Sequence, residues 1–192
     1  AIDTIPSVKA KADWALSWIT NDKPLALRLV AFACVEGIMF SSSFCAIYWL
    51  TRDGKFGGLG QSNELISRDE RLHTEFACKL YELMDAPLDE KTVHAVVRHA
   101  VDVEQAFVRD ALPEALLGMN AETMSTYVEC VADRLVVGLR HPKLAAPYAP
   151  VYGATNPFTW MDKLGVKSKT NFFEQRVNDY KLASISTGET LE

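Results

Sequence analysis

The chain has 192 residues, of which 48% are hydrophobic and 23% charged, the balance of a soluble globular protein and not of a disordered or fibrous one. Its net charge of -5 comes without any long run of Lys or Arg, so the sequence shows no basic footprint for a nucleic-acid partner. Cys34, Cys45, Cys78 and Cys130 stand far apart with no CxxC spacing. This arrangement disfavours disulfides and a zinc cluster and fits a reducing, cytoplasmic compartment.

Apolar residues recur at intervals of three and four through most of the chain, which predicts an all-α fold. Ala1 is not an initiator Met, and no basic segment followed by an apolar run is visible there, so we expect Ala1 to be an internal point of a longer chain. The first expected helix covers about 5–20, with Pro6 in its first turn. The second, 24–51, is apolar on almost all sides, so it should be central to the fold.

A glycine-rich turn at 53–60 separates this central helix from a third helix at 62–84. Pro87 and Asp89 open a fourth helix near 88–112, and Asn120 can cap a fifth at 121–140. We therefore expect three parts, which are the helices of a bundle (1–140), an extended proline-rich segment (141–170), and a short helix with a mobile polar tail (171–192).

Three residues carry most of the chemical information. Glu36 lies in the middle of the most apolar helix, while Glu70 and His73 stand three apart on the next, which puts them on one helical face. A carboxylate in apolar surroundings is costly unless it is protonated, paired or bound to a metal, so Glu36 requires a partner. Ferritin-like di-iron sites use a Glu from each of two helices and a Glu-x-x-His from each of two others, and this chain offers one of each.

Other interpretations of these residues stay open. A lone buried Glu is more often a salt-bridge partner, and a Glu-x-x-His spacing arises often by chance. The stretch 29–50 carries a single charge, which a hydropathy window would interpret as a membrane span with Glu36 near its centre. No second span of comparable apolarity could shelter that carboxylate, so we expect a protein that does not cross a membrane.

Two longer segments resemble the small subunit of class I ribonucleotide reductase of the eukaryotic type. They are 35–44 (VEGIMFSSSF) and 63–73 (NELISRDERLH), and the resemblance extends to about residue 183. It implies a ferritin-like bundle, a di-iron centre that uses O₂ to form a tyrosyl radical, a homodimer of small subunits, and a large subunit on which ribonucleotides are reduced. Shorter matching segments are 11–15, 118–120, 131–135 and 169–177.

The resemblance also implies roles for single residues. Glu36, Glu70 and His73 match the ligands of one iron, although manganese accepts the same carboxylate and imidazole groups. Asp69 matches an acidic residue on the radical-transfer path that orients a metal-bound histidine, and Tyr180 matches the tyrosine that passes the radical between subunits. Phe40, Phe44 and Ile66 match the apolar pocket that shields the radical. A surface charge, an amphipathic-helix tyrosine and plain core packing would look the same in sequence.

The chain departs from the family pattern at both ends. The other half-site, with its Asp, second Glu-x-x-His and radical tyrosine, lies upstream of the family's equivalent of Ala1, and the last twelve residues lack the family's aromatic and acidic docking terminus. Either the chain is part of a longer protein or another chain supplies the rest, such as a second copy in a two-fold dimer. A radical-generating subunit is thus one expectation, and a metal-free or inactive relative with a structural or regulatory role is the other.

Overall fold

The computed structural model describes residues 2–19, 22–116 and 118–161, and within these ranges the chain is helical with no strands. The predicted all-α class is confirmed. One isolated bridge joins Leu116 and Met119. The helices are α1 (Pro6–Leu16), α2 (Leu25–Gly37), α3 (Ser41–Thr51), α4 (Gly57–Glu82), α5 (Glu90–Ala111) and α6 (Ala121–Gly138).

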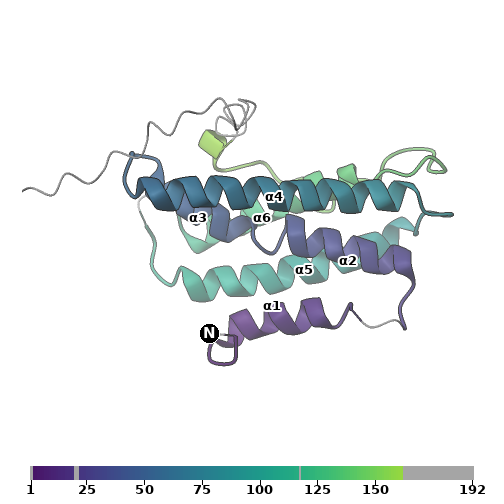
Figure 1. The fold of residues 1–192 in the computed structure, drawn as a ribbon, viewed down its shortest axis with the longest axis horizontal. Helices are drawn as coiled ribbons and strands as arrows, with labels where there is room; N and C mark the ends of the chain where they lie inside the picture. Colours follow the sequence, from purple (N-terminus) through teal and green to yellow (C-terminus); the bar gives the residue numbers. More distant parts are fainter. Residues whose placement is uncertain (1, 20–21, 117, 162–192) are drawn as a thin grey trace, which may run out of the picture.

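The helices pack around α2, as the apolar composition of that segment predicts. Figure 1 shows α4 along one side of α2 and α3, with α5 on the opposite side and α1 beyond it. α6 packs against α5, α2 and α3. Val30, Ala31, Ala33 and Cys34 of α2 are fully buried, together with residues of α5 and α6.

The segment 24–51 is not one helix, which corrects the prediction. α2 ends at Gly37 and α3 starts at Ser41, with residues 38–40 between them outside any helix. The Met39 amide donates to Cys34 O, five residues back, whereas the Ser41 amide donates to Ile38 O, three residues back. The Ser41 hydroxyl also donates to Ile38 O at 2.7 Å. Side-chain bonds of this kind and i→i−5 bonds are recognised causes of helix breaks.

The ends of α1 and α4 also differ from the prediction. α1 stops at Leu16, and Lys23 and Arg28 donate instead to the carbonyls of 17–19. α4 begins at Gly57 within the glycine-rich turn, directly after Phe56, whose φ of 54° is left-handed. Such a residue reverses the chain direction sharply, so α4 can start earlier than its apolar pattern indicates. The predicted cap at Asn120 is confirmed, since it accepts the Thr123 amide at the start of α6. Asp89, which was expected only to open its helix, accepts the Thr92 amide as the cap of α5.

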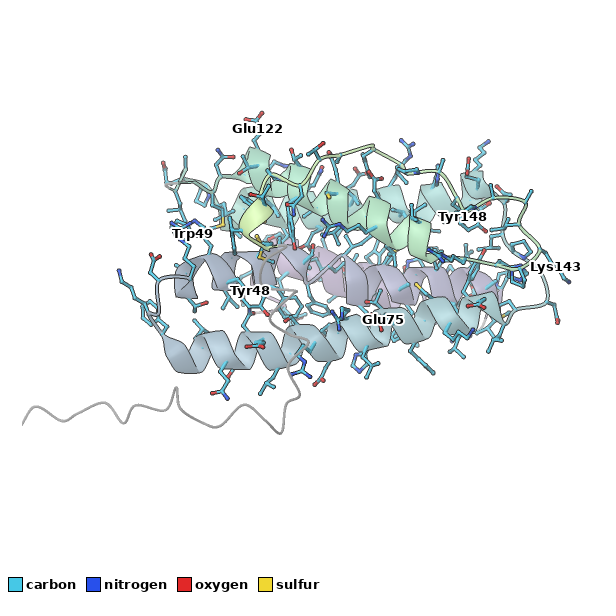
Figure 2. All side chains as sticks on the ribbon, turned by 90° about the horizontal axis from the view of Figure 1, so that it is seen from above. Tyr48, Trp49, Glu75, Glu122, Lys143 and Tyr148 are labelled. Atoms are coloured by element: carbon cyan, nitrogen blue, oxygen red, sulfur yellow. The ribbon has the colours of Figure 1, made fainter. Side chains whose placement is uncertain are left out.

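The chain after α6 returns across the ends of α4 and α5 (Figure 2). The hydroxyls of Tyr148 and Tyr81 lie 2.6 Å apart, and Tyr148 donates to Leu88 O. His141 is buried and its Nε2 lies 2.9 Å from Met84 O. The Asp133 carboxylate of α6 accepts the amides of Val151, Tyr152 and Ala154, so this irregular segment is tied to the bundle at several points.

Residues Leu25–Thr51 are long and apolar enough to cross a membrane by length and composition, with a mean hydropathy of 1.8 over the best window. Half of that window is buried inside the protein, because α2 and α3 form its central layer. A core helix of a globular bundle meets the same criterion, so the hydropathy alone does not indicate a span.

Candidate metal centre

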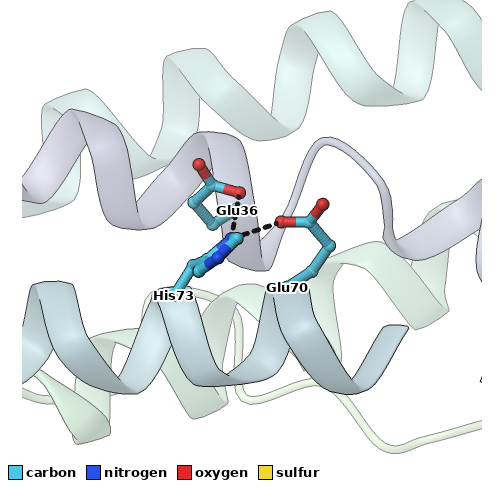
Figure 3. Close-up of side chains that lie close together, drawn as sticks. All are labelled: Glu36, Glu70 and His73. Carbon is cyan, nitrogen blue, oxygen red and sulfur yellow. Dashed lines mark hydrogen bonds and ion pairs between the residues drawn. The ribbon is translucent and has the colours of Figure 1, made fainter. Parts of the chain in front are cut away.

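Glu36, Glu70 and His73 converge between α2 and α4 (Figure 3). His73 Nδ1 lies 3.1 Å from Glu70 Oε2 and 3.6 Å from Glu36 Oε2. One donor atom from each residue falls within a group whose members are all within 4.8 Å of one another. The expected meeting of the buried Glu with the Glu-x-x-His pair is present in the structure.

A glycine brings the two helices close enough for this meeting. Gly37 follows Glu36, and a Cβ built on it would lie 3.1 Å from Cγ2 of Thr74, the residue after His73. Thr74 in turn donates its hydroxyl to Glu70 O at 2.8 Å, which keeps its side chain against α4. A larger residue at 37 would push α2 away from α4 beside the three donor groups.

The electrostatics of the site are those of two carboxylates held close together. Burial raises the pKa of Glu36 to about 7, and the neighbouring Glu70 adds to the rise. The hydrogen bond from Glu36 lowers the pKa of Glu70, and the hydrogen bond to Glu70 raises the pKa of His73. Two neighbouring carboxylates disfavour the doubly charged state, and here the protonated form is favoured at Glu36.

Two carboxylates and an imidazole form a donor set that suits a divalent transition metal. Carboxylate oxygen and neutral imidazole nitrogen are ligands of borderline hardness, accepted by iron and manganese alike. A cation could take the place of the proton on Glu36 and remove the repulsion between Glu36 and Glu70. The side chains of Glu36 and Glu70 are 15% and 20% exposed, and that of His73 is 51% exposed, so the site is open on the His73 side. The three residues present therefore fit a metal, with coordination positions left for other groups.

A cavity of about 770 Å³ adjoins the site between α3, α4 and α6. Glu36 and Glu70 line it, and so do Phe44 and Tyr48 of α3. Tyr48 lies between α3 and α4 in Figure 2, with its hydroxyl 2.7 Å from Ser67 Oγ. Because Ser67 donates to Glu64 O, Tyr48 is the donor in this pair.

Among the described residues, the structure does not bring the other predicted site residues into contact with the three donor groups in the same way. The rings of Phe40 and Phe44 lie 6.2 Å apart. Phe40 is part of the break at 38–40 and Phe44 is on α3, so neither shares a helix with Glu36, as the single helix predicted at 24–51 would require. Ile66 is 51% exposed on α4, and Asp69 is exposed beside Glu70. Their roles remain predictions. Tyr180 lies outside the described residues.

Sequence reasoning missed a carboxylate that is more deeply buried than that of Glu36. Glu104 of α5 is fully buried, accepts the hydroxyl of Ser42, and lies 2.7 Å from Lys11 Nζ of α1. Its position on the apolar stripe formed by Val97, Ala100, Val101 and Val108 is the same signal that identified Glu36, and it could have been found in the same way.

Comparison with known proteins identifies the family to which this chain belongs. Residues 1–152 match the family described as "Ribonucleotide reductase, small chain". The chain belongs to the ribonucleotide reductase small-chain family. Among curated relatives of this family, it is 54% identical over 185 residues to the ribonucleoside-diphosphate reductase small chain of Nicotiana tabacum. It is 49% identical, also over 185 residues, to the corresponding protein of Plasmodium falciparum.

These matches cover 96% of this chain but only 54% and 51% of the two relatives, so the chain spans about half of their length. Among solved structures, the ribonucleotide reductase Rnr4 homodimer of Saccharomyces cerevisiae aligns with a TM-score of 0.71 and 32% identity. That alignment covers 88% of this chain and 53% of the yeast chain. A putative class I ribonucleotide reductase from Bacillus halodurans, at 21% identity and a TM-score of 0.72, supports the fold alone.

Proposed function

We propose that this chain contributes one half of the metal centre of a ribonucleoside-diphosphate reductase small subunit. The observation that carries the proposal is the convergence of Glu36, Glu70 and His73 in a member of the small-chain family. The three residues would hold one metal ion, with iron as the expected metal and manganese as the alternative. A loaded di-iron centre supplies oxidising power from O₂ for the one-electron oxidation of a tyrosine.

The remaining ligands would come from polypeptide outside this chain. A ferritin-like centre needs a second Glu and a second Glu-x-x-His from two further helices. The curated relatives are about twice as long as the stretch they share with this chain, which leaves ample length for those helices. The exposed side of His73 marks the direction from which they would approach.

The chain's own residues have distinct tasks in this proposal. Glu36 and Glu70 would hold the cation through carboxylate oxygens, and His73 would hold it through an imidazole nitrogen. Asp69 would relay the oxidising equivalent outward and Tyr180 would pass it to the large subunit, while Phe40, Phe44 and Ile66 would keep water from the radical. Nucleotide reduction would take place on the large subunit, with the small subunits paired as a homodimer in the cytoplasm.

Metal analysis of the full-length protein tests this proposal. We expect about two Fe per chain after anaerobic loading, as a di-iron centre requires. Admission of O₂ should give a tyrosyl signal in electron paramagnetic resonance. Glu70→Gln should lose the metal because an amide is a poor replacement for a carboxylate ligand. Glu75→Gln is the matched control, since Glu75 is on the same helix, lines the adjoining cavity and pairs with Arg71.

The alternative is a metal-free small-chain relative with a structural or regulatory role. Glu36, Glu70 and His73 would then be a polar cluster held together by the contacts of His73 with the two carboxylates. Protein that stays iron-free and manganese-free after loading would support this alternative and contradict the main proposal.

A further inference from the structure

Three polar side chains from three helices meet inside the protein where α3 begins. Glu104 of α5 is fully buried, the Ser42 hydroxyl of α3 donates to its Oε1, and Lys11 of α1 places Nζ 2.7 Å from its Oε2. The Lys11 side chain is only 14% exposed, and its Nζ lies 4.1 Å from the centroid of the Phe107 ring. Each carboxylate oxygen thus has its own partner from a different helix.

This cluster lies directly after the break between α2 and α3. Glu36 is the last residue but one of α2, and Ser42 is the second residue of α3. Only residues 38–41 therefore lie between Ser42 and the end of the helix that carries Glu36. The Ser41 hydroxyl donates to Ile38 O within the break itself. Ser42 is therefore the residue next to the break that ties α3 to helices elsewhere in the bundle.

The backbone alone does not fix the orientation of α3 relative to α2. In a regular helix, uniform i→i−4 hydrogen bonds set the direction in which each side chain points. Across 38–40 one amide reaches five residues back and another three, so the regular ladder is interrupted. Side-chain contacts must supply the missing restraint, and Glu104 is suited to this because a buried carboxylate is costly to separate from its partners.

We propose that Ser42, Glu104 and Lys11 are positioning residues for Glu36. Their contacts hold the start of α3 in place, and this keeps the break at 38–40 in one geometry. Because the break is fixed, the last turn of α2 holds Glu36 close to Glu70 and His73. The inference rests on the proposed metal site for its functional meaning, whereas its structural part concerns the break itself. The competing explanation is a buried ion pair that only adds stability to the bundle.

The Ser42→Ala variant of the full-length protein separates the two explanations. Two quantities are measured, namely amide hydrogen exchange of the metal-free protein by mass spectrometry and Mn(II) affinity from the loss of the free-ion resonance signal. We expect faster exchange confined to peptides that span residues 34–42. We also expect Mn(II) affinity to fall by about tenfold, the lower end of what lost support of a ligand costs.

Asn120→Ala is the control, because it removes a cap from α6 and so destabilises the protein at a distance from the break. It should leave both readouts near those of the wild type. Equal changes in the two variants, or unchanged exchange at 34–42 in Ser42→Ala, would overturn the inference. If the wild type binds no Mn(II), the proposed function fails, and hydrogen exchange still decides whether Ser42 holds the break.

Discussion

Lys11 and Glu104 form a buried ion pair whose two charges depend on each other. The desolvation of Glu104 raises its pKa, and the Lys11 ammonium and the Ser42 hydroxyl lower it only in part. A carboxyl group whose folded-state pKa is raised contributes stability at low pH that is lost as the pH rises through that pKa. The ammonium of Lys11 therefore limits a penalty that would otherwise grow toward neutral pH.

Lys11→Met should lower the free energy of unfolding by about 3 kcal/mol at pH 8, because it leaves a buried carboxylate without a counter-charge. The loss should shrink toward pH 5, where Glu104 can take up a proton in place of the ion pair. Urea unfolding at both pH values measures this. Lys9→Met is the control, since the Lys9–Asp13 pair on the same helix is about half exposed, with side-chain exposures of 51% and 57%, and its loss should matter little. An equal loss at both pH values would contradict the argument.

Gly37 is the second residue whose size has a consequence at the site. Gly37→Ala places a Cβ 3.1 Å from Thr74 Cγ2, so the Thr74 side chain or α2 must move by a few tenths of an ångström beside Glu36. Mn(II) affinity should fall by about tenfold, as it does when the groups supporting a ligand are disturbed. Adding Thr74→Ser removes the obstructing methyl group and should restore the affinity.

Gly138→Ala is a matched control for this substitution, because its Cβ would meet Cys78 Sγ at 3.9 Å, an ordinary contact. The role given to Gly37 would be disproved by an affinity that stays low in the double variant, or by one that falls equally in Gly138→Ala.

At the scale of elements, one carboxylate of α6 accepts three backbone amides of the returning segment. Asp133 is 8% exposed and accepts three amides from Val151, Tyr152 and Ala154. Hydrogen bonds to a charged group contribute about 1.5–3 kcal/mol each when they are lost from a buried position. The segment therefore depends on α6 as much as on its own tyrosine contacts.

Asp133→Asn keeps the shape of the side chain but removes its charge and one acceptor oxygen. We expect a loss of about 2 kcal/mol in the free energy of unfolding and faster amide exchange at 151–154. Asp110→Asn, an exposed change on α5, serves as the control. Unchanged exchange at 151–154 would show that the tyrosine and histidine contacts hold the segment without Asp133.

Sequence periodicity was sufficient to predict some of these helices and their ends, but it could not predict others. The stripes and caps of α5 and α6 are local signals, so Asn120 could be predicted as a cap and Asp89 as a residue that opens its helix. Glu36, Glu70 and His73 followed from helical spacing and family resemblance. The break at 38–40 could not be predicted, because its residues are apolar and include no proline, and one of its restraints lies on α5. Contacts between distant helices leave no periodic trace in the sequence.

At the scale of the whole molecule, α4 presents an unusual outer face. Leu59, Ile66, Leu72, Phe76 and Leu83 are between 45% and 69% exposed, and His73 stands among them. Across from α4, Phe32 of α2 and Phe40 at the break are each 39% exposed. Under the proposed function, this apolar surface around the donor groups is where the helices with the remaining ligands would pack.

The 192-residue chain on its own should consequently self-associate. We expect concentration-dependent light scattering and binding of a hydrophobic dye, both reduced in a Phe76→Gln/Leu83→Gln variant because it interrupts the apolar face. A Leu16→Gln/Ile19→Gln variant changes equally exposed residues near the first helix and should have less effect. A monodisperse chain that unfolds cooperatively would contradict this expectation.

The number of residues between α2 and α3 also affects the rotation of α3 about its own axis. Side chains within α3 keep fixed directions relative to one another, about 100° per residue. A change in the number of residues at 38–40 would therefore shift all of them together relative to the cavity and to Glu104. Deleting one of them would rotate Ser42, Phe44 and Tyr48 together, whereas replacing one would leave their directions intact. Within this family, insertions and deletions at that point should therefore be tolerated far less than changes of residue type.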